Sequence, residues 1–462
     1  MNWVDSAIAM LPEHFLLAGI VLLVALQSAA PARKEGAFLV SLAAVVAAAA
    51  VAAWLSLSGF AFAAFTDHYS VGPAALLAKA IVLALAVPVL LISRDEAGER
   101  AYSVLLLSSL YGVCLLLSAD SFLTLFLGLE LMSLPVYALV LVDYRRPRSA
   151  EGALKYLVLG GTATATLLMG ASLLYGSGGS LALSAFGAAL SSSDAMASAA
   201  VVLVVVAFYL KAAIVPFHAW APDAYEAAPV PVTAYMATII KAGVLLAAVR
   251  LFGSAPIAPP IADVLAILPL LSIVWGNLAA MRQQSFRRMI AYSSIAHAGY
   301  LFYAFLGDGD GRFQAVAFYV VAYGIMNLLA FASLPRAEDD IARDRLDSLK
   351  GLFHRKPFAA VMIAIAMLSL AGIPPFPGFV AKFLIFRNVF AAGYTVYAVL
   401  GLVGSYLGIY FYLRVIQYMF MSTEEPEVKQ RSTGGLTLGA TFLCLVLTVA
   451  IAVFPGWVID HL

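Results

Sequence analysis

The chain has 462 residues, of which 63% are hydrophobic and only 11% are charged. A soluble globular domain is about 45–50% apolar and about 25% charged, so this composition excludes an ordinary soluble protein and predicts a membrane protein. The two cysteines, Cys114 and Cys444, both lie in apolar runs. They are expected to be small core residues, with no disulfide or metal framework.

We expect an all-α polytopic membrane protein with about 14 transmembrane helices, because a spanning helix needs roughly 20 apolar residues. The twelfth apolar run is too long for one straight span, and its GIPPFPG stretch at residues 372–378 must bend or unwind it. The expected helices lie at about 14–30, 37–57, 73–93, 101–118, 121–142, 153–175, 197–216, 230–252, 261–281, 289–306, 313–335, 357–391, 393–421 and 434–458.

Two lysines and a helix break occur together between residues 203 and 243. Lys211 lies inside an apolar run, and Pro216, which lacks a backbone donor, is expected to break that helix. Lys241 lies in the middle of the next apolar helix. A lysine at the bilayer centre costs about 2.5–3.5 kcal/mol on insertion scales, and a broken helix at membrane depth needs protein or a watery cavity beside it. Together these features predict an ion or proton path through the membrane.

Three further ionisable side chains lie within apolar runs. Lys382 follows the GIPPFPG break, so a second break also has a lysine close by. Glu130 is the only acidic residue that we expect deep in a run. An isolated buried carboxylate takes up a proton, whereas a nearby lysine keeps it ionised; a purely structural ion pair is the alternative. His297, in the polar context AYSSIAHAGY, is either a hydrogen-bonded core residue or a proton relay.

The remaining polar groups near the apolar runs have simpler expectations. Lys79 and Arg414 lie near helix ends, and each is expected to extend its ammonium or guanidinium group to the membrane surface; for Lys79, a role in carrying protons is the alternative. His218, Asp223 and Glu226 lie in the amphipathic segment after the first break. These three residues either serve proton traffic or are structural and solvated.

Lysine and arginine are distributed unevenly between the connections, and cytoplasmic loops carry an excess of both. The alternate connections and the termini hold only Arg250, Arg312 and Arg387. We therefore expect the 31–36 connection and the charged run 336–356 to be cytoplasmic and solvated, and both termini to be periplasmic in a bacterial inner membrane. The basic set comprises Arg33, Lys34, Arg94, Arg100, Arg145, Arg146, Arg148, Lys155, Arg282, Arg287, Arg288, Arg336, Arg343, Arg345, Lys350, Arg355, Lys356, Lys429 and Arg431.

Several kinds of motif are absent from the sequence. There is no GxGxxG fingerprint with a ribose-binding acid, no P-loop, no cysteine cluster for an iron–sulfur centre and no histidine pair with haem or zinc spacing. We expect no cofactor, metal or nucleic acid to bind this chain. Its expected surroundings are those of the lipid bilayer.

Three stretches of the chain resemble one known family, the antiporter-like membrane subunits of respiratory complex I and of multisubunit cation/proton antiporters. They are LKAAIVPFHAWAPDAYEAAPVPVTAYMATIIKAG (210–243), LGLELMSLPVYALV (127–140) and AGIPPFPGFVAKFLIF (371–386). The resemblance covers nearly the whole chain. Within the family, the length, Lys382 and the segment EAAPVPVTAYMAT resemble the branch called subunit N.

The resemblance implies a single membrane domain over residues 1–462 with two inverted five-helix repeats. The N-terminal helices would occupy residues 1–100, the repeats 101–252 and 261–421, and the last helix 434–458. Helices 7 and 12 would be broken, a general transporter design. Proton translocation would use Glu130, Lys211, Lys241, His297 and Lys382.

The resemblance also implies a division of labour among subunits. Partner subunits would hold the flavin, the iron–sulfur clusters and the quinone, while this chain moves protons beside neighbouring antiporter-like subunits. Two alternatives use the same lysines: a subunit of a multisubunit cation/proton antiporter, and a membrane subunit of a hydrogenase-type complex.

Overall fold

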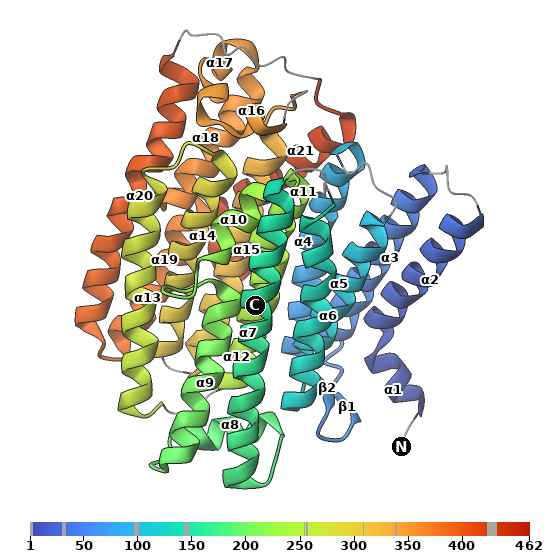
Figure 1. Ribbon diagram of the computed structural model, residues 1–462, viewed down its shortest axis with the longest axis vertical. Coiled ribbons are helices and arrows are strands. Elements are labelled where there is room, and N and C mark those ends of the chain that lie inside the picture. The colour runs from blue at the N-terminus through green and yellow to red at the C-terminus, as the bar shows by residue number, and fades with distance from the viewer. Residues whose placement is uncertain are drawn as a thin grey trace.

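The computed structural model describes residues 3–29, 34–96, 101–142, 147–253, 255, 257–307, 309–337, 340–422 and 432–462. Within these ranges the protein is nearly all helical, and its long helices stand side by side (Figure 1). Among the described residues, twelve helices are long and apolar enough to cross a membrane, and two shorter apolar helices lie at 102–117 and 357–371. Arg33, Arg100, Arg145, Arg146, Lys429 and Arg431 of the expected cytoplasmic set lie outside the described residues.

The N-terminal part contains four helices and an unexpected hairpin. A two-stranded antiparallel hairpin connects the second and third expected spans, with Phe62 paired to Val71. It marks one end of the bundle, called the hairpin end below (Figure 1). The elements are α1 (Trp3–Ala9), α2 (Leu11–Ala29), α3 (Lys34–Leu57), β1 (Phe62–Phe65), β2 (Tyr69–Val71) and α4 (Pro73–Glu96).

The middle of the chain contains the first expected break. The helix that carries Lys211 ends at Ala212, and Ala213 has a left-handed backbone with φ 62°. The break therefore begins before Pro216, because in a continuous helix the proline ring would clash with the carbonyl of Ala212, four residues earlier. The elements are α5 (Tyr102–Leu117), α6 (Phe122–Val140), α7 (Pro147–Gly178), α8 (Leu183–Leu190), α9 (Ala195–Ala212), α10 (Trp220–Ala227), α11 (Val230–Tyr235), the π-helix η1 (Met236–Ile240) and α12 (Lys241–Phe252).

The last part contains the second expected break. Helix α18 ends at Ala371, Gly372 has φ 82°, and α19 starts at Pro377. The end of the bundle opposite the hairpin carries α16 and α17 and is called the α16 end (Figure 1). The elements are α13 (Pro259–Ala280), α14 (Phe286–Tyr303), η2 (Ala304–Leu306), α15 (Gly309–Ser333), α16 (Asp340–Asp344), η3 (Leu346–Leu349), α17 (Leu352–Arg355), α18 (Pro357–Ala371), α19 (Pro377–Ala391), α20 (Thr395–Met421), α21 (Gly435–Val453) and α22 (Pro455–Asp460).

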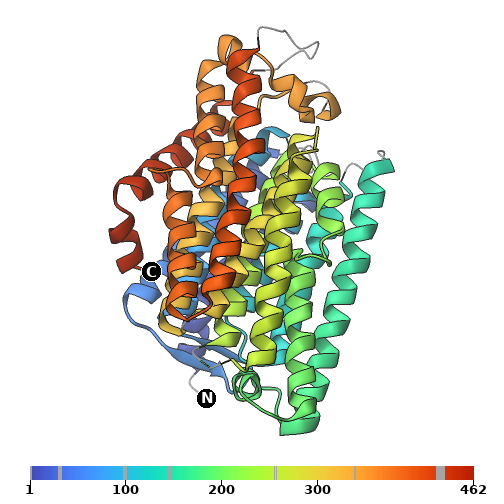
Figure 2. The ribbon, with the colours of Figure 1, turned by 90° about the vertical axis from the view of Figure 1, so that its left-hand side faces the viewer.

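The interior of the bundle is formed by α12, α14 and α15, whose side chains are almost all buried. Helices α2, α3, α7, α20 and α21 lie around them and expose large apolar side chains (Figures 1 and 2). The last long helix, α21, packs against both α4 and α15. Exposed apolar surface of this extent fits contact with lipid or with partner membrane helices.

Helices α5 and α6 approach closely at a glycine. A Cβ atom on Gly112 would lie 2.2 Å from the backbone nitrogen of Met132. Both residues are buried, so backbone would have to move to make room. We expect Gly112→Ala to destabilise the protein by about 1–3 kcal/mol or more, the usual cost of overpacking. Thermal unfolding and gel filtration in detergent measure this effect.

Gly161→Ala is the matched control for that change. Gly161 lies in another long helix, α7, and a Cβ atom there would meet no heavy atom within 4 Å. The control should unfold at the temperature of the parent protein or slightly above it, because alanine favours a helix interior over glycine. Equal stability of the two variants would contradict the close approach of α5 and α6.

Candidate functional site

The carboxylate of Glu130 on α6 and the ammonium of Lys211 on α9 form an ion pair. Their Oε1 and Nζ atoms are 3.4 Å apart. Lys211 also donates to Ser133 Oγ at 3.3 Å, and Thr164 of α7 donates to the same Glu130 oxygen. The lysine side chain is only 5% exposed, whereas the glutamate is 22% exposed. The pair, called the central ion pair below, is therefore accessible from its acidic side.

The unwound backbone after Lys211 is satisfied by protein groups. Trp220 Nε1 donates to the carbonyl of Leu210 at 2.9 Å. The amide of Val215 donates to Ser272 Oγ on α13 at 2.6 Å. Such partners make a break tolerable at membrane depth. Lys211 thus lies in the last turn of a helix whose C-terminal carbonyls attract positive charge.

Lys241 lies where the π-helix η1 returns to α-helix. Its Nζ donates to the backbone oxygen of Ser294 on α14 at 2.5 Å and also bonds to the hydroxyl of that residue. The Tyr225 hydroxyl of α10 lies 3.4 Å from the same Ser294 hydroxyl. Local π-helices occur often at functional sites. No acidic side chain bonds to Lys241 within the described part of the chain, so its partners are neutral.

His297 on α14 is enclosed by tyrosines from two other helices. Its Nδ1 lies 2.7 Å from the hydroxyl of Tyr319 on α15, and its Nε2 lies 3.1 Å from the hydroxyl of Tyr412 on α20. The Tyr412 hydroxyl lies 2.5 Å from Ser293 Oγ. Both ring nitrogens therefore have hydroxyl partners, which can donate or accept. Each hydrogen bond joins the imidazole to an element distant in sequence.

Lys382 on α19 reaches back to the second break. Its Nζ donates to the carbonyl of Ala371, the last residue of α18, at 2.9 Å, and to Ser405 Oγ on α20 at 3.0 Å. It also lies 5.1 Å from the centre of the Tyr300 ring. Lys382 lines a cavity of about 640 Å³ between α18, α19 and α20, whose other lining residues are mostly apolar and aromatic.

Helix α14 connects these lysines. Ser294, His297 and Tyr300 follow one another at intervals of three residues, a spacing that places helical side chains beside their neighbours. The first bonds to Lys241, the second is the imidazole, and the third presents its ring to Lys382. Among the predicted site residues, the structure thus pairs Glu130 with Lys211 directly and gathers the other three around α14.

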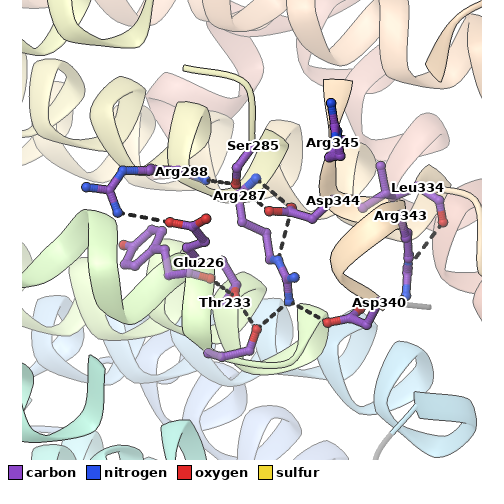
Figure 3. A network of polar contacts seen from close by, with 12 residues as sticks. Glu226, Thr233, Ser285, Arg287, Arg288, Leu334, Asp340, Arg343, Asp344 and Arg345 are labelled. Carbon is purple, nitrogen blue, oxygen red and sulfur yellow. Dashed lines mark hydrogen bonds and ion pairs between the residues drawn. The ribbon is translucent and has the colours of Figure 1, made fainter. Parts of the chain in front are cut away.

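A charged network occupies the α16 end of the bundle, where α10, α14 and α16 meet (Figure 3). Arg287 of α14, only 3% exposed, lies 3.0 Å from Asp340 and 3.0 Å from Asp344, and it donates to the carbonyl of Ala228. The expectation of a solvated run at 336–356 is therefore wrong for Arg343 and Asp344, which are buried. Arg287 holds this segment against the membrane helices.

The acidic residues of α10 belong to the same end of the bundle. Asp223 accepts hydrogen bonds from Arg288 and from Lys155 at 2.5 Å each, and Glu226 accepts from Arg288 at 2.9 Å. Burial raises the pKa of Asp223, but the bonds from Lys155 and Arg288 outweigh it and hold that pKa below its usual value. The ionised Asp223 carboxylate therefore stabilises the folded protein. This stabilisation is fully present above the pKa that Asp223 has in the unfolded chain, and it is lost as the pH falls through the lower pKa of the folded protein. The sequence left open whether these residues are solvated; they are ion-paired.

His218 lies in the break segment and contacts α13. Its Nε2 accepts a hydrogen bond from Trp275 Nε1 at 3.1 Å. Burial lowers the pKa of His218, which favours the neutral imidazole. Arg414 donates to the carbonyl of Met281 at 2.9 Å, so it closes the end of α13.

Lys79 differs most from its sequence-based expectation. Its side chain is fully buried, and it donates to Glu13 Oε1 at 2.6 Å. The prediction that Lys79 extends to the membrane surface is therefore wrong, and Glu130 is not the only acidic residue inside the bundle. Glu13 was missed because the apolar run begins directly after it, whereas α2 begins at Leu11 and includes it. The signal that could have identified Glu13 was its position, two residues after the start of α2 at Leu11.

Residues 119–408, more than half of the chain, match the family described as NADH:quinone oxidoreductase/Mrp antiporter, transmembrane. The chain belongs to this family. The matched residues include the central ion pair, both breaks, Lys241, His297 and Lys382. The family assignment agrees with the resemblance seen in the three sequence stretches.

Relatives cover almost the entire chain. NADH-quinone oxidoreductase subunit N of Pelobacter propionicus is 38% identical over 97% of this chain and 96% of its own length. The corresponding protein of Laribacter hongkongensis is 33% identical over 96% of this chain and 95% of its own length. Both relatives are called subunit N, which is the branch that this sequence resembles in its length, Lys382 and the segment EAAPVPVTAYMAT.

Solved structures share the fold. A chain of respiratory complex I from Thermus thermophilus superposes with a TM-score of 0.85, at 34% identity over 97% of this chain and 98% of that chain. A chain of the Mrp complex from Dietzia sp. has a TM-score of 0.86 at 21% identity, over 100% of this chain and 96% of that chain. The second likeness concerns the fold alone. Within the described residues, no group of three or more His, Cys, Asp or Glu side chains is arranged to hold a metal ion.

Proposed function

We propose that this chain is a proton-translocating membrane subunit of an NADH-quinone oxidoreductase. The observation that carries the proposal is a set of buried ionisable side chains beside two broken helices, in a chain 38% identical to a subunit N over nearly its full length. Electron transfer from NADH to quinone takes place in partner subunits, which hold the flavin and the iron–sulfur clusters. This chain moves protons through its own side chains.

The central ion pair acts as the switch. While the Glu130 carboxylate lies near Lys211, the charged ammonium is favoured; when they separate, burial favours the neutral amine. Lys211 then passes a proton onward. The 3.4 Å separation and the hydroxyls of Ser133 and Thr164 suit a pair that opens and closes, because each charged group keeps a polar partner.

The groups around α14 form the onward path. Lys241 bonds to Ser294, and the His297 imidazole holds a tyrosine hydroxyl at each nitrogen. A hydroxyl both donates and accepts, so protons can pass along such contacts by exchange of hydrogen bonds. Lys382 is the last group of the path, at the cavity beside the second break. It exchanges its proton with water or with a neighbouring subunit.

The test of the function is purification of the tagged chain from its native membranes. We expect flavin- and iron–sulfur-containing subunits to copurify, together with other antiporter-like subunits and NADH-quinone oxidoreductase activity. The chain purified alone should have no visible absorption from a cofactor and should not oxidise NADH. Copurification with antiporter subunits that lack redox centres would instead place the chain in a cation/proton antiporter.

Orientation gives a separate prediction. The basic residues gather in the connections expected at the α16 end, so we propose that this end faces the cytoplasm of a bacterium and that both termini are periplasmic. A reporter enzyme that is active only in the periplasm, fused after Leu462, should be active. The matched fusion after Lys350, in the connection at the α16 end, should be inactive. The reverse pattern would contradict the proposed topology.

A further inference from the structure

The ion pair of Glu13 and Lys79, called the N-terminal ion pair here, lies outside the path proposed above. It joins α2 to α4 at the hairpin end of the bundle, and both side chains are 0% exposed. The hydroxyl of Tyr69 on β2 completes the site, at 2.8 Å from Glu13 Oε1 and 2.9 Å from Lys79 Nζ. A carboxylate, an ammonium and a hydroxyl from three separate elements thus meet in the interior.

The site repeats the chemistry of the central ion pair in a tighter form. In both pairs a glutamate and a lysine from different helices also bond to hydroxyl groups, which are two separate ones in the central ion pair and the single Tyr69 hydroxyl in the N-terminal ion pair. The N-terminal pair is shorter, at 2.6 Å against 3.4 Å, and fully enclosed, whereas Glu130 is 22% exposed. The N-terminal ion pair is therefore closed off from the surface of the protein, whereas the central ion pair is partly open to it.

Two buried polar atoms at the N-terminal ion pair lack a hydrogen-bond partner among the described residues: Glu13 Oε2 and Ser118 Oγ. The carbonyl of Ser118 accepts from the amide of Ser70, so Ser118 lies beside the strand that carries Tyr69. Buried polar atoms without protein partners are commonly satisfied by internal water. Glu13 Oε2 is thus the atom of this site that is able to accept a proton without breaking a hydrogen bond.

We propose that Glu13, Lys79 and Tyr69 form a second proton-holding site of this chain, with Glu13 as the group that takes up and gives up the proton. A proton that enters from the aqueous phase and is relayed by internal water binds to Glu13 Oε2, which changes the charge of the pair from zero to plus one and leaves the relaying water neutral. Release returns that proton to water, and no other reactant is needed. This inference rests on the proposed function, because it concerns proton movement by the same subunit.

A purely structural ion pair is the competing explanation, and a double variant separates the two. Removal of one partner leaves a buried unpaired charge and is expected to prevent assembly, whereas replacement of both by apolar residues of similar size is often neutral for stability. Glu13→Leu/Lys79→Met should therefore assemble and oxidise NADH normally. If the site holds protons, this variant moves fewer protons per NADH oxidised.

The measurement is proton uptake and NADH oxidation in membrane vesicles at matched amounts of assembled complex. Tyr69→Phe keeps the ion pair and removes only the hydroxyl, so it should assemble and lose part of the proton movement. Glu35→Leu/Arg94→Met, which replaces an exposed ion pair between α3 and α4, is the control and should behave as the parent. A normal ratio of protons moved to NADH oxidised in the double variant overturns the proposal. If the double variant does not assemble, a normal ratio in Tyr69→Phe overturns the proposal instead.

Glu130→Gln in the same membranes keeps this test separate from the proposed function. If Glu130→Gln lowers proton movement and the N-terminal variants do not, only the second site is rejected. If none of the variants changes proton movement, the proposed function is rejected as well.

Discussion

Glu130→Gln is expected to remove most of the proton movement while the complex remains assembled. At an effective dielectric of about 20, two unit charges at this separation attract each other by about 4–5 kcal/mol, and desolvation of both groups offsets part of that. Loss of even about 1.4 kcal/mol changes the equilibrium between charged and neutral lysine tenfold. The glutamine cannot hold Lys211 in its charged form, so the switch stays in one state. Proton uptake in vesicles during NADH oxidation measures the effect.

Three companion variants show whether Glu130 and Lys211 act as one unit. Glu130→Asp keeps the charge on a shorter side chain and should retain part of the activity. Lys211→Ala should be about as damaging as Glu130→Gln, and the double variant should be little worse than either, because coupled residues are not additive. Glu35→Gln, at a glutamate that is 84% exposed, is the control and should be silent. Additive losses in the double variant would show that the two residues act independently.

The breaks were predictable because they depend on local chemistry. Proline lacks a donor and disfavours helix before it, and Gly372 adopts φ 82° without the steric cost of a side chain. The π-helix directly before Lys241 was not predictable, because the sequence MATII contains neither proline nor glycine. This segment packs against α4 and α15, which are distant in the chain.

The candidate site residues and the pairing of Glu130 with a lysine were predictable from the sequence, whereas the partners of His297, Lys241 and Lys382 were not. A lysine or glutamate inside an apolar run stands out from composition alone, which identified Glu130, Lys211, Lys241 and Lys382. The partners of His297 are tyrosines from α15 and α20, and nothing in their local sequence distinguishes them from other buried aromatic residues. The expected neighbours Ser293, Ser294 and Tyr300 lie on α14, but only the tertiary fold shows which of them bonds to which lysine.

Charged groups near helix ends were the hardest to predict. Local sequence cannot distinguish a lysine that extends to the membrane surface from one that pairs inward, because both lie within a few residues of an apolar boundary. Lys79 pairs with a residue 66 positions earlier, and Arg287 pairs with residues more than 50 positions later. The apolar helices themselves follow from composition, since burial of their side chains needs no particular partner.

Lys382→Ala is expected to stop the last step of proton transfer and leave the complex assembled. The ammonium of Lys382 lies at the C-terminal end of α18, where unpaired carbonyls carry partial negative charge. Removal of the side chain leaves the carbonyl of Ala371 without this donor, but the adjoining cavity of about 640 Å³ is large enough to admit water in its place. Assembly should therefore survive, while proton movement per NADH falls well below that of the parent.

Lys382→Arg separates the charge of this residue from its proton chemistry. A guanidinium keeps the positive charge beside the end of α18 but does not release its proton in a protein. If Lys382 carries protons, the arginine variant should assemble at the parental level and still move few protons, as the alanine variant does. If the residue only stabilises the broken helix, arginine should restore both assembly and proton movement. Native electrophoresis of the complex and proton uptake in vesicles, measured on the same membranes, distinguish the two results, because a structural role predicts that the two quantities change together.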